Sequence, residues 1–281
     1  MNDDDIAILK VIVIVLAGVL GLLVGSFLNV VIYRVPLGQS IVSPPSACPR
    51  CGARVRRRDN VPVLSWLVLR AKCRDCGEPI SARYPLVELA TGLLFAAAAY
   101  RFPLPYGIPA QYIVATVMIL VALLYFAAIS VALTGIDLDT HKLPNTIVLP
   151  SYIVIAALLT AASVVYGDYT QLLPALIGAV AMFVVYFAMA LAYPGGMGFG
   201  DVKLAGVIGL LLGFLGWGIL IVGAFAAFLL GGLFGIALLA TRRARRGSGI
   251  PFGPWMLGGA WVGIFFGSQI WTGYLGLVGL A

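Results

Sequence analysis

The sequence is poor in charge. Only 10% of its 281 residues are Asp, Glu, Lys or Arg, whereas 62% are hydrophobic and the mean hydropathy is +1.05. Soluble domains carry about 25% charged and about 45–50% apolar residues, so the composition excludes a soluble globular protein and predicts an integral membrane protein. The net charge of +7 is compatible with nucleic-acid binding. The distribution of the basic residues argues for membrane topology instead, and we predict no nucleic-acid partner.

Histidine is almost absent, and the sequence shows no glycine-rich cofactor loop following a strand. The single histidine, His141, cannot build a histidine-based metal site and has no persuasive partner for a catalytic triad. We interpret it as a polar loop residue beside Lys142. The sequence alone therefore locates no cofactor site.

Long apolar runs fill most of the chain. About 20 apolar residues span a bilayer as a helix. Windows of this kind cover residues 8–32, 85–101, 112–134, 146–166, 172–193, 202–216, 218–240 and 255–279. We predict an all-α polytopic membrane protein with about eight transmembrane helices. The second and sixth windows are short, so seven spans is the alternative if the sixth and seventh form a re-entrant hairpin.

Basic residues cluster on one side of this topology. If the N-terminus lies outside, the cytoplasmic segments are 33–84, 135–145, 194–201 with its flank, and 241–254, and of the 18 Lys and Arg only Lys10 and Arg101 fall elsewhere. This asymmetry follows the positive-inside rule, so we expect a multi-pass protein of the bacterial inner membrane with its N-terminus outside. Three aspartates, at 3–5, precede the first apolar run where a signal peptide would be basic, so we expect that run to remain as a span. A cluster of arginines near the C-terminus is expected to bind anionic lipid: Arg242, Arg243, Arg245 and Arg246.

The chain divides into a first span (1–34), a hydrophilic insert (35–84) and an apolar core (85–281). The insert holds the only four cysteines of the chain, as two CxxC pairs about twenty residues apart: Cys48, Cys51, Cys73 and Cys76. This spacing is typical of a structural zinc site, and a glycine after each pair lets the turn close. Disulfides are the first alternative, disfavoured in a reducing cytoplasm, and a redox CxxC is the second. Because the insert is small, we expect the metal to stabilise its fold.

Two aspartates lie at the edges of apolar runs. Asp137 closes one run and Asp201, in Gly198-Phe-Gly-Asp201, precedes another. An ionisable residue at the edge of the hydrocarbon is costly to desolvate and is by default a candidate for function. We predict a carboxylate pair that activates water. The alternative is a pair of ordinary interfacial charges.

Five motifs occur together in one order. They are Gly25-Ser-Phe-Leu-Asn29 through Pro36, the two CxxC pairs followed by Gly77-Glu-Pro79 through Glu88, the Asp137-x6-Pro144 segment, the GxGD segment, and Ile250-Pro-Phe-Gly-Pro254. Together they resemble the bacterial type IV prepilin peptidases, a family of membrane aspartyl proteases that are also N-methyltransferases. The resemblance implies that Asp137 and Asp201 are catalytic and that the four cysteines bind zinc. It also implies cleavage of the basic leader of prepilin-like substrates after a glycine at the cytoplasmic face, followed by N-methylation from S-adenosylmethionine.

The methyltransferase site is not located by the sequence. Gly25, Asn29 and Glu88 are candidates because they lie in the matching segments. Helix packing for the first two and an interfacial charge for Glu88 are equally good interpretations.

The chemistry predicts different roles for the two acids. Of two carboxyl groups that share a proton, one draws a proton from water and the other polarises the peptide carbonyl. Asp201 begins a span, where the helix dipole favours an anion, and Asp137 ends one, so we predict Asp201 as base and Asp137 as acid. We interpret Asp139 as a solvated loop carboxylate. The glycines of segment 194–200 suit the approach of an extended substrate.

Two other functions compete with this prediction. A proton-coupled transporter would use the aspartates as a relay, but such proteins usually place charges at the midplane and show internal repeats, which we do not find. A zinc-stabilised scaffold of a secretion machine would tolerate loss of Asp201. The sequence leaves open whether the substrates serve pili, secretion or DNA uptake.

Overall fold

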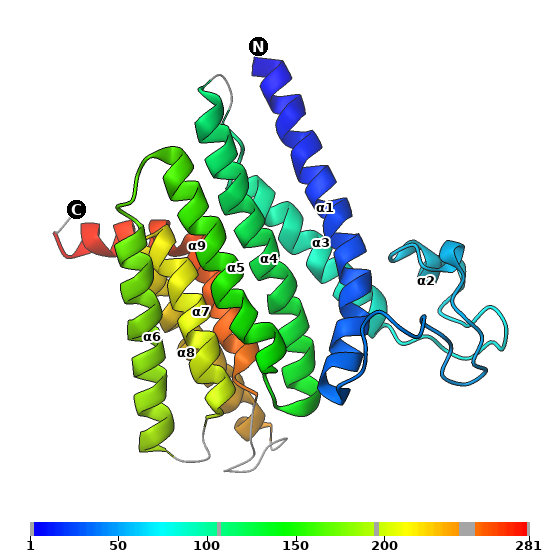
Figure 1. Cartoon of the computed structure of the whole chain (residues 1–281). Coiled ribbons are helices and arrows are strands. Elements are labelled where there is room, and N and C mark those ends of the chain that lie inside the picture. The colour runs from blue at the N-terminus through cyan, green and yellow to red at the C-terminus, as the bar shows by residue number, and fades with distance from the viewer. Residues whose placement is uncertain (1–2, 106–107, 194–196, 242–250, 280–281) are drawn as a thin grey trace. The chain divides into compact units, whose positions relative to one another are not determined.

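The computed structural model describes residues 3–105, 108–193, 197–241 and 251–279, and these are almost entirely helical (Figure 1). Each of the eight apolar windows forms one helix. The helices are α1 (Asp3–Arg34), α3 (Arg83–Arg101), α4 (Ala110–Thr140), α5 (Asn145–Tyr166), α6 (Leu172–Ala192), α7 (Phe199–Leu215), α8 (Trp217–Ala240) and α9 (Gly253–Leu277). The insert adds the short helices η1 (Val35–Leu37), η2 (Arg57–Asp59) and α2 (Leu64–Val68). The prediction of an all-α fold is confirmed.

The predicted number of eight spans is not confirmed. Within the described ranges, five helices are long and apolar enough to cross a membrane: α1, α4, α5, α6 and α8. Helix α3 has 19 residues, among them Glu88 and Arg101, and α7 has only 17. Both are shorter than the roughly 20 residues that span a bilayer. Eight helices are present, but length and composition identify five of them as spans.

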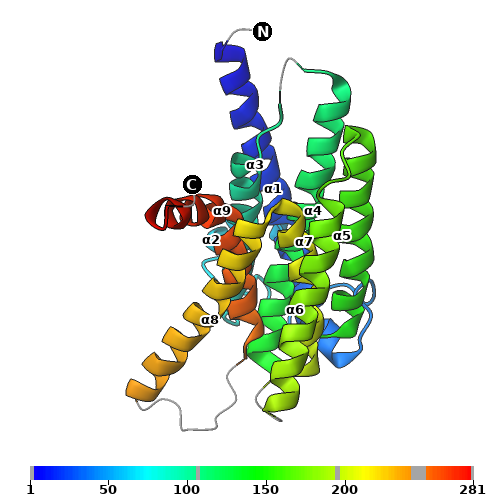
Figure 2. The ribbon, with the colours of Figure 1, turned by 90° about the vertical axis from the view of Figure 1, so that its left-hand side faces the viewer.

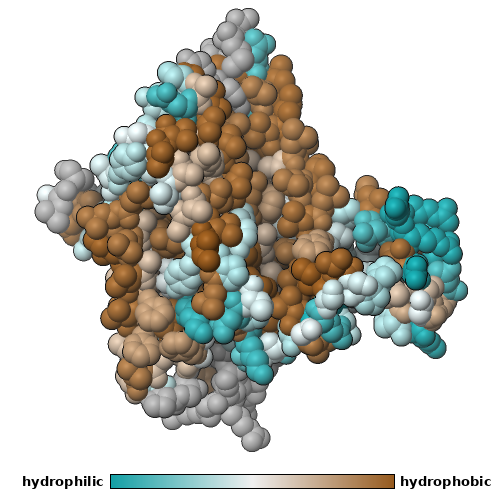
Figure 3. Space-filling view, in the orientation of Figure 1, coloured by the Kyte–Doolittle hydropathy of each residue, from teal (hydrophilic) through white to brown (hydrophobic). Residues whose placement is uncertain are grey.

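Apolar side chains cover much of the outer surface of the helices. Figure 3 shows hydrophobic residues over the helical surface and hydrophilic residues gathered around the insert. Exposed examples are Leu16 at 62%, Ile153 at 73% and Phe225 at 68% of their full area. Such a surface is stable in lipid rather than in water, so the chain is an integral membrane protein.

The first of two compact units comprises residues 1–135. In it α1 and α3 pack closely because glycines let the two backbones approach. A Cβ added at Gly25 would lie 2.7 Å from Cα of Glu88, and one at Gly21 would lie 2.7 Å from the carbonyl oxygen of Thr91. The Asn29 amide strengthens the crossing by donating to the carbonyl of Tyr84 at 3.2 Å. Small residues at such contacts are typical of helices packed in membranes.

The second unit comprises residues 136–281 and is organised around α7, which packs against α5, α6, α8 and α9 (Figures 1 and 2). Twelve of the 17 residues of α7 are buried. A helix that is apolar and buried all round is a core helix, which explains why α7 can be short. The tight α6–α7 contact rests on glycines, since a Cβ at Gly178 would lie 2.5 Å from the carbonyl oxygen of Gly209.

Polar contacts fix α5 against α7. The Tyr152 hydroxyl donates to the backbone carbonyl of Lys203 at 2.6 Å. The Lys203 ammonium donates to the side-chain oxygen of Asn145 at 2.9 Å and lies 4.8 Å from the centre of the Phe199 ring. These contacts hold the N-terminal turn of α7 against the beginning of α5.

Some predicted features fall on residues that the structure does not describe. These are the arginine cluster 242–246, the first three residues of the glycine-rich segment 194–200, and Ile250 of the last motif.

Candidate active site and metal centre

Asp137 lies in the last turn of α4 and is buried, with 4% of its surface exposed. Its Oδ2 atom accepts a hydrogen bond of 3.1 Å from the backbone N–H of Gly253, 116 residues away in sequence. Gly253 is the first residue of α9, so the carboxylate of Asp137 faces the positive end of that helix. Helix α4 presents its negative end to the same group. Asp137 therefore lies between two opposing helix dipoles.

A side chain at position 253 would displace the carboxylate of Asp137. A Cβ there would lie 2.7 Å from Oδ2 of Asp137, well inside van der Waals contact. A glycine lets the N–H approach the carboxylate, and Pro254 at the helix start has no N–H to lose. The 3.1 Å distance between the Gly253 N–H and the Asp137 carboxylate depends on this residue.

Asp201 lies in the first turn of α7, at the third helical position. Its Oδ2 atom accepts a hydrogen bond of 3.0 Å from the backbone N–H of Gly198, which precedes the helix. A carboxylate that reaches back to the N-cap N–H is the usual acid component of a capping box. With 9% of its surface exposed, Asp201 is also buried. The same side chain thus begins the helix and presents an ionisable group inside the protein.

The structure brings the two predicted aspartates together in the second unit. The carboxylate of Asp137 lies within electrostatic reach of that of Asp201. Leu143 packs against Gly200, which precedes Asp201, and against Gly253, which binds Asp137. A Cβ added at Gly200 would lie 2.9 Å from Cβ of Leu143, and a Cβ added at Gly253 would lie 3.3 Å from Cδ2 of Leu143. Leu143 therefore contacts both the residue before Asp201 and the residue that holds Asp137.

The two other polar residues of this segment lie outside the pair. Asp139 belongs to the last turn of α4 rather than to a loop, but it is exposed as predicted. His141 ends the helix with φ +53°, and its N–H donates to the carbonyl of Asp137 at 2.9 Å. Left-handed backbone is several times more common for histidine than for most residues. The backbone of His141 terminates α4, and its ring is exposed.

The four cysteines of the insert form one cluster. Their sulfur atoms all lie within 4.8 Å of one another, and the sulfurs of Cys48 and Cys76 are 3.8 Å apart. Tetrahedral Zn–S bonds of about 2.3 Å place sulfur atoms about 3.8 Å from each other, so the donor set fits a tetrahedral zinc ion. The cluster can hold a metal ion.

Each CxxC pair is a tight turn of the same construction. The N–H of Cys48 donates to the carbonyl of Ala53 at 2.9 Å, and the N–H of Cys73 donates to that of Glu78 at 2.8 Å. Gly52 and Gly77 follow with φ of +71° and +75°, the left-handed conformation that glycine adopts without strain. The predicted closing role of both glycines is confirmed.

Two thiols of the cluster, those of Cys48 and Cys76, have pKa values shifted in opposite directions. Hydrogen bonds from the backbone N–H groups of Cys51 and Arg50 lower the pKa of Cys48 to about 7. The backbone at Glu78 lowers the pKa of Cys76, but desolvation and the neighbouring thiols outweigh it and raise the value to about 12. Cys48 therefore loses its proton more readily than Cys76, and a bound cation would favour the thiolate form of both residues.

Ion pairs connect the two turns. Arg50 pairs with Glu78, and Arg56 pairs with Asp75 at 2.6 Å, each joining residues of opposite CxxC turns. Arg74 holds Asp59 of η2 at 2.6 Å. The Arg50–Glu78 and Arg56–Asp75 pairs are partly exposed, so they orient the turns more than they stabilise them.

Gly25 and Asn29 lie where α1 crosses α3, as the packing interpretation of these two residues predicts, and Gly25 faces Glu88 across the crossing. Glu88 is buried, and its Oε2 accepts a hydrogen bond of 2.7 Å from the backbone N–H of Val63 in the insert. Val63 has φ +61° and ψ −50°, an unusual conformation for a β-branched residue. Glu88 therefore ties a strained turn of the insert to the α1–α3 pair.

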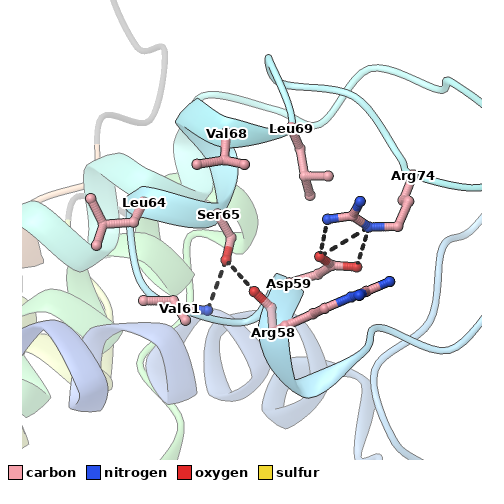
Figure 4. Close-up of a pocket in the computed structure, with 8 residues that line it drawn as sticks. All are labelled: Arg58, Asp59, Val61, Leu64, Ser65, Val68, Leu69 and Arg74. Atoms are coloured by element: carbon pink, nitrogen blue, oxygen red, sulfur yellow. Dashed lines mark hydrogen bonds and ion pairs between the residues drawn. The ribbon is translucent and has the colours of Figure 1, made fainter.

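A cavity of about 200 Å³ lies in the insert beside α2 (Figure 4). Its polar groups bind each other: Arg74 binds Asp59, and the Ser65 hydroxyl accepts from Val61 and donates to Arg58. Ligand sites usually measure about 300–1,000 Å³. This cavity does not fit S-adenosylmethionine, and we assign no methyl-donor site to it.

Two residues of the aspartate site escape prediction from the sequence. Gly253 was identified as part of a motif, but its partner lies 116 residues away. Leu143 resembles any loop leucine. The signal that can indicate Gly253 is the glycine–proline pair that opens α9, because it marks a helix start with a free N–H.

Comparison with known proteins agrees with these features. Residues 19–102 match the bacterial peptidase A24 N-terminal domain, and residues 124–236 match the type IV leader peptidase family. No solved structure matches the chain.

The chain is similar to curated proteins named prepilin leader peptidase/N-methyltransferase. That of Pseudomonas putida is 36% identical over 295 residues, with 95% of each chain covered, and that of Aeromonas hydrophila is 35% identical over 283 residues, with 90% of this chain and 91% of the relative covered. The Myxococcus xanthus protein is 44% identical over 235 residues, covering 80% of this chain and 63% of the relative. With this similarity over nearly its whole length, the chain belongs to the type IV leader peptidase family.

Proposed function

We propose that this protein is an inner-membrane endopeptidase that removes the basic leader of prepilin-like proteins and N-methylates the new N-terminus. The observation that carries the peptidase activity is the convergence of two buried carboxylates from α4 and α7, each held by one backbone N–H. The similarity to prepilin leader peptidase/N-methyltransferases supports the substrate class and the second activity.

Asp137 and Asp201 hydrolyse the peptide bond in this proposal. The ionised carboxylate takes a proton from a water molecule, whose oxygen attacks the carbonyl carbon, while the protonated carboxyl gives its proton to the carbonyl oxygen. When the tetrahedral intermediate collapses, the C–N bond breaks and the leaving nitrogen takes a proton from the pair. Each Oδ2 is occupied by a backbone N–H, which leaves Oδ1 of each residue for this chemistry.

Asp201 remains our choice as the resting base, although two helix dipoles rather than one act on Asp137. Asp137 ends α4 as the sequence argument assumed, but the first N–H of α9 faces it and opposes the dipole of α4. Infrared difference spectra of Asp137→Asn and Asp201→Asn variants report which carboxyl carries the proton. Loss of the protonated-carboxyl band in Asp201→Asn alone would reverse the assignment.

Zinc, bound by Cys48, Cys51, Cys73 and Cys76, has a structural role in this proposal, because four thiolates leave no open position for a substrate. S-adenosylmethionine supplies the methyl group. The predicted orientation, with the N-terminus outside, places the insert and both aspartates at the cytoplasmic face, where basic residues meet anionic lipid.

Co-expression with a prepilin substrate tests the peptidase assignment. We expect Asp137→Asn and Asp201→Asn to abolish leader removal, because each leaves a single carboxyl group. The matched control is Asp139→Asn, which alters an exposed carboxylate two residues from Asp137 and should leave processing intact. Immunoblots separate precursor from mature protein, and mass spectrometry of the mature N-terminus measures methylation.

Processing by either single variant at the wild-type rate would remove that aspartate from the mechanism. Equal loss in Asp139→Asn would show that a general disturbance of the end of α4, rather than the carboxylate pair, is being measured.

A further inference from the structure

Tyr186 in α6 has a buried hydroxyl without a hydrogen-bond partner among the described residues. The side chain is 1% exposed and is one of the largest fully buried groups of the molecule. A phenolic O–H removed from water without an acceptor costs free energy, and such groups are rare in folded proteins. The presence of a buried tyrosine hydroxyl without a hydrogen-bond acceptor therefore needs an explanation.

The register of α6 against α7 places Tyr186 at the level of Asp201. A Cβ at Gly213 would meet the carbonyl oxygen of Pro174, and one at Gly178 would meet that of Gly209, so the helices run antiparallel with 174 opposite 213 and 178 opposite 209. Two turns, of about four residues each, lead forward along α6 from 178 to 186 and backward along α7 from 209 to 201. Position 186 therefore lies opposite position 201. The hydroxyl of Tyr186 lies within electrostatic reach of the Asp201 carboxylate.

The ring of Tyr186 also reaches the support of the other aspartate. Its centre lies 6.3 Å from that of Phe252, the residue directly before Gly253, whose N–H holds Asp137. Phe228 completes a cluster, 5.5 Å from Tyr186 and 5.6 Å from Phe252. Three packed rings fix the direction of the phenol and surround it with apolar groups, where a hydrogen bond to a developing charge is stronger than in water.

We propose that Tyr186 is a third catalytic residue, which donates its hydroxyl in a hydrogen bond to the carbonyl oxygen of the scissile peptide as that oxygen gains negative charge. The inference rests on the proposed peptidase function and adds a residue to it. The phenol keeps its proton throughout, and the two carboxyl groups carry out all proton transfers. The acceptor arrives with the substrate, which accounts for a donor without a partner in the free enzyme.

Tyr186→Phe removes this one oxygen and keeps the ring cluster. For the full-length protein in detergent, acting on a purified prepilin, we expect kcat to fall on the order of 100-fold, as for loss of one oxyanion donor, with KM nearly unchanged. The midpoint of thermal unfolding should stay the same or rise, because the variant deletes a buried polar group that had no partner.

Tyr152→Phe is the matched control. Its hydroxyl has a partner, the carbonyl of Lys203 at 2.6 Å, so this variant should unfold at a lower temperature than the wild type. The two tyrosines are thus expected to show opposite effects, Tyr186 on rate and Tyr152 on stability.

A wild-type kcat for Tyr186→Phe would overturn the proposal. A shifted pH–rate profile would overturn it as well, because it would show that Tyr186 acts through Asp201 rather than on the substrate; an unshifted profile with lower kcat supports it. The peptidase assignment is tested separately, since Asp137→Asn and Asp201→Asn must be inactive whatever the result at Tyr186.

Discussion

The insert of the first unit and helix α7 of the second stabilise their structures in opposite ways. The short helices η2 and α2 contain no buried residue, and the cysteine cluster with its ion pairs organises the surrounding chain. Helix α7 has twelve buried residues and close glycine contacts. The insert depends on polar and metal-binding groups, and the site around α7 depends on packing.

The buried carboxylates of the two units show the same contrast. Glu88 and Asp137 each accept one backbone N–H from a distant segment, at 2.7 Å and 3.1 Å. Asp137 faces a second carboxylate, that of Asp201, whereas Glu88 faces the backbone of a strained turn. One buried carboxylate with a backbone donor serves as a tether, and two that share a site can divide a proton between them.

Removal of the metal ion proposed for the cysteine cluster should have the largest effect on the stability of the insert relative to that of the second unit. Chelation, or the Cys73→Ser variant, should unfold the insert, because structural zinc contributes about 10–16 kcal/mol in small zinc-binding peptides. Limited proteolysis should then cut within residues 38–82 while α5–α9 remain protected. Readdition of zinc after chelation is the control, and an insert that stays resistant without metal would show that it folds on its own.

Gly253→Ala should have the next largest effect, because the added Cβ would push against Oδ2 of Asp137. We expect kcat for leader cleavage to fall about 10- to 100-fold, as for a displacement of a catalytic group by about 1 Å. Gly258→Ala in the same helix is the control, since its Cβ would meet Leu230 at an ordinary 3.6 Å. Equal activity of the two variants would mean that the Gly253–Asp137 contact does not position the carboxylate.

Glu88→Ala should destabilise the insert without slowing cleavage by the folded protein. It leaves the N–H of Val63 without an acceptor, at a cost of about 1–3 kcal/mol. Glu88→Gln keeps an acceptor and should restore most of the stability. Hydrogen exchange at residues 61–68 measures the effect. A Glu88→Gln protein that is stable but no longer methylates its product would instead make Glu88 part of the methyltransferase site.

The Asp59–Arg74 pair of the insert should matter least. Hydrogen bonding from Arg74 holds the pKa of Asp59 below its ordinary value of 3.8. A lowered pKa in the folded state stabilises the protein above the unfolded pKa, so the contribution is complete at neutral pH and is lost as the pH falls through the folded value. Asp59→Asn should therefore lower insert stability slightly at pH 7, and the difference from wild type should shrink in acid. A difference that grows in acid would contradict this sign.

Sequence reasoning located the helices and the candidate residues but not the contacts that hold them. Apolar windows marked all eight long helices because hydropathy is a local property, and the convergence of Asp137 with Asp201 followed from their motifs. The number of spans stays a prediction: five of the described helices are long and apolar enough to cross a membrane, and α7, with twelve buried residues, is covered by neighbouring helices. Tyr186 lies in an ordinary apolar helix, and only the register of α6 against α7 reveals its position.

The bond between Gly253 and Asp137 also has a consequence for biogenesis. Helix α4 emerges from the ribosome long before α9, since the donor follows the acceptor by 116 positions. Until α9 has been inserted beside it, a nascent chain carries an aspartate without its N–H donor. Assembly of the hydrolytic centre is thereby delayed until after the preceding helices have been synthesised.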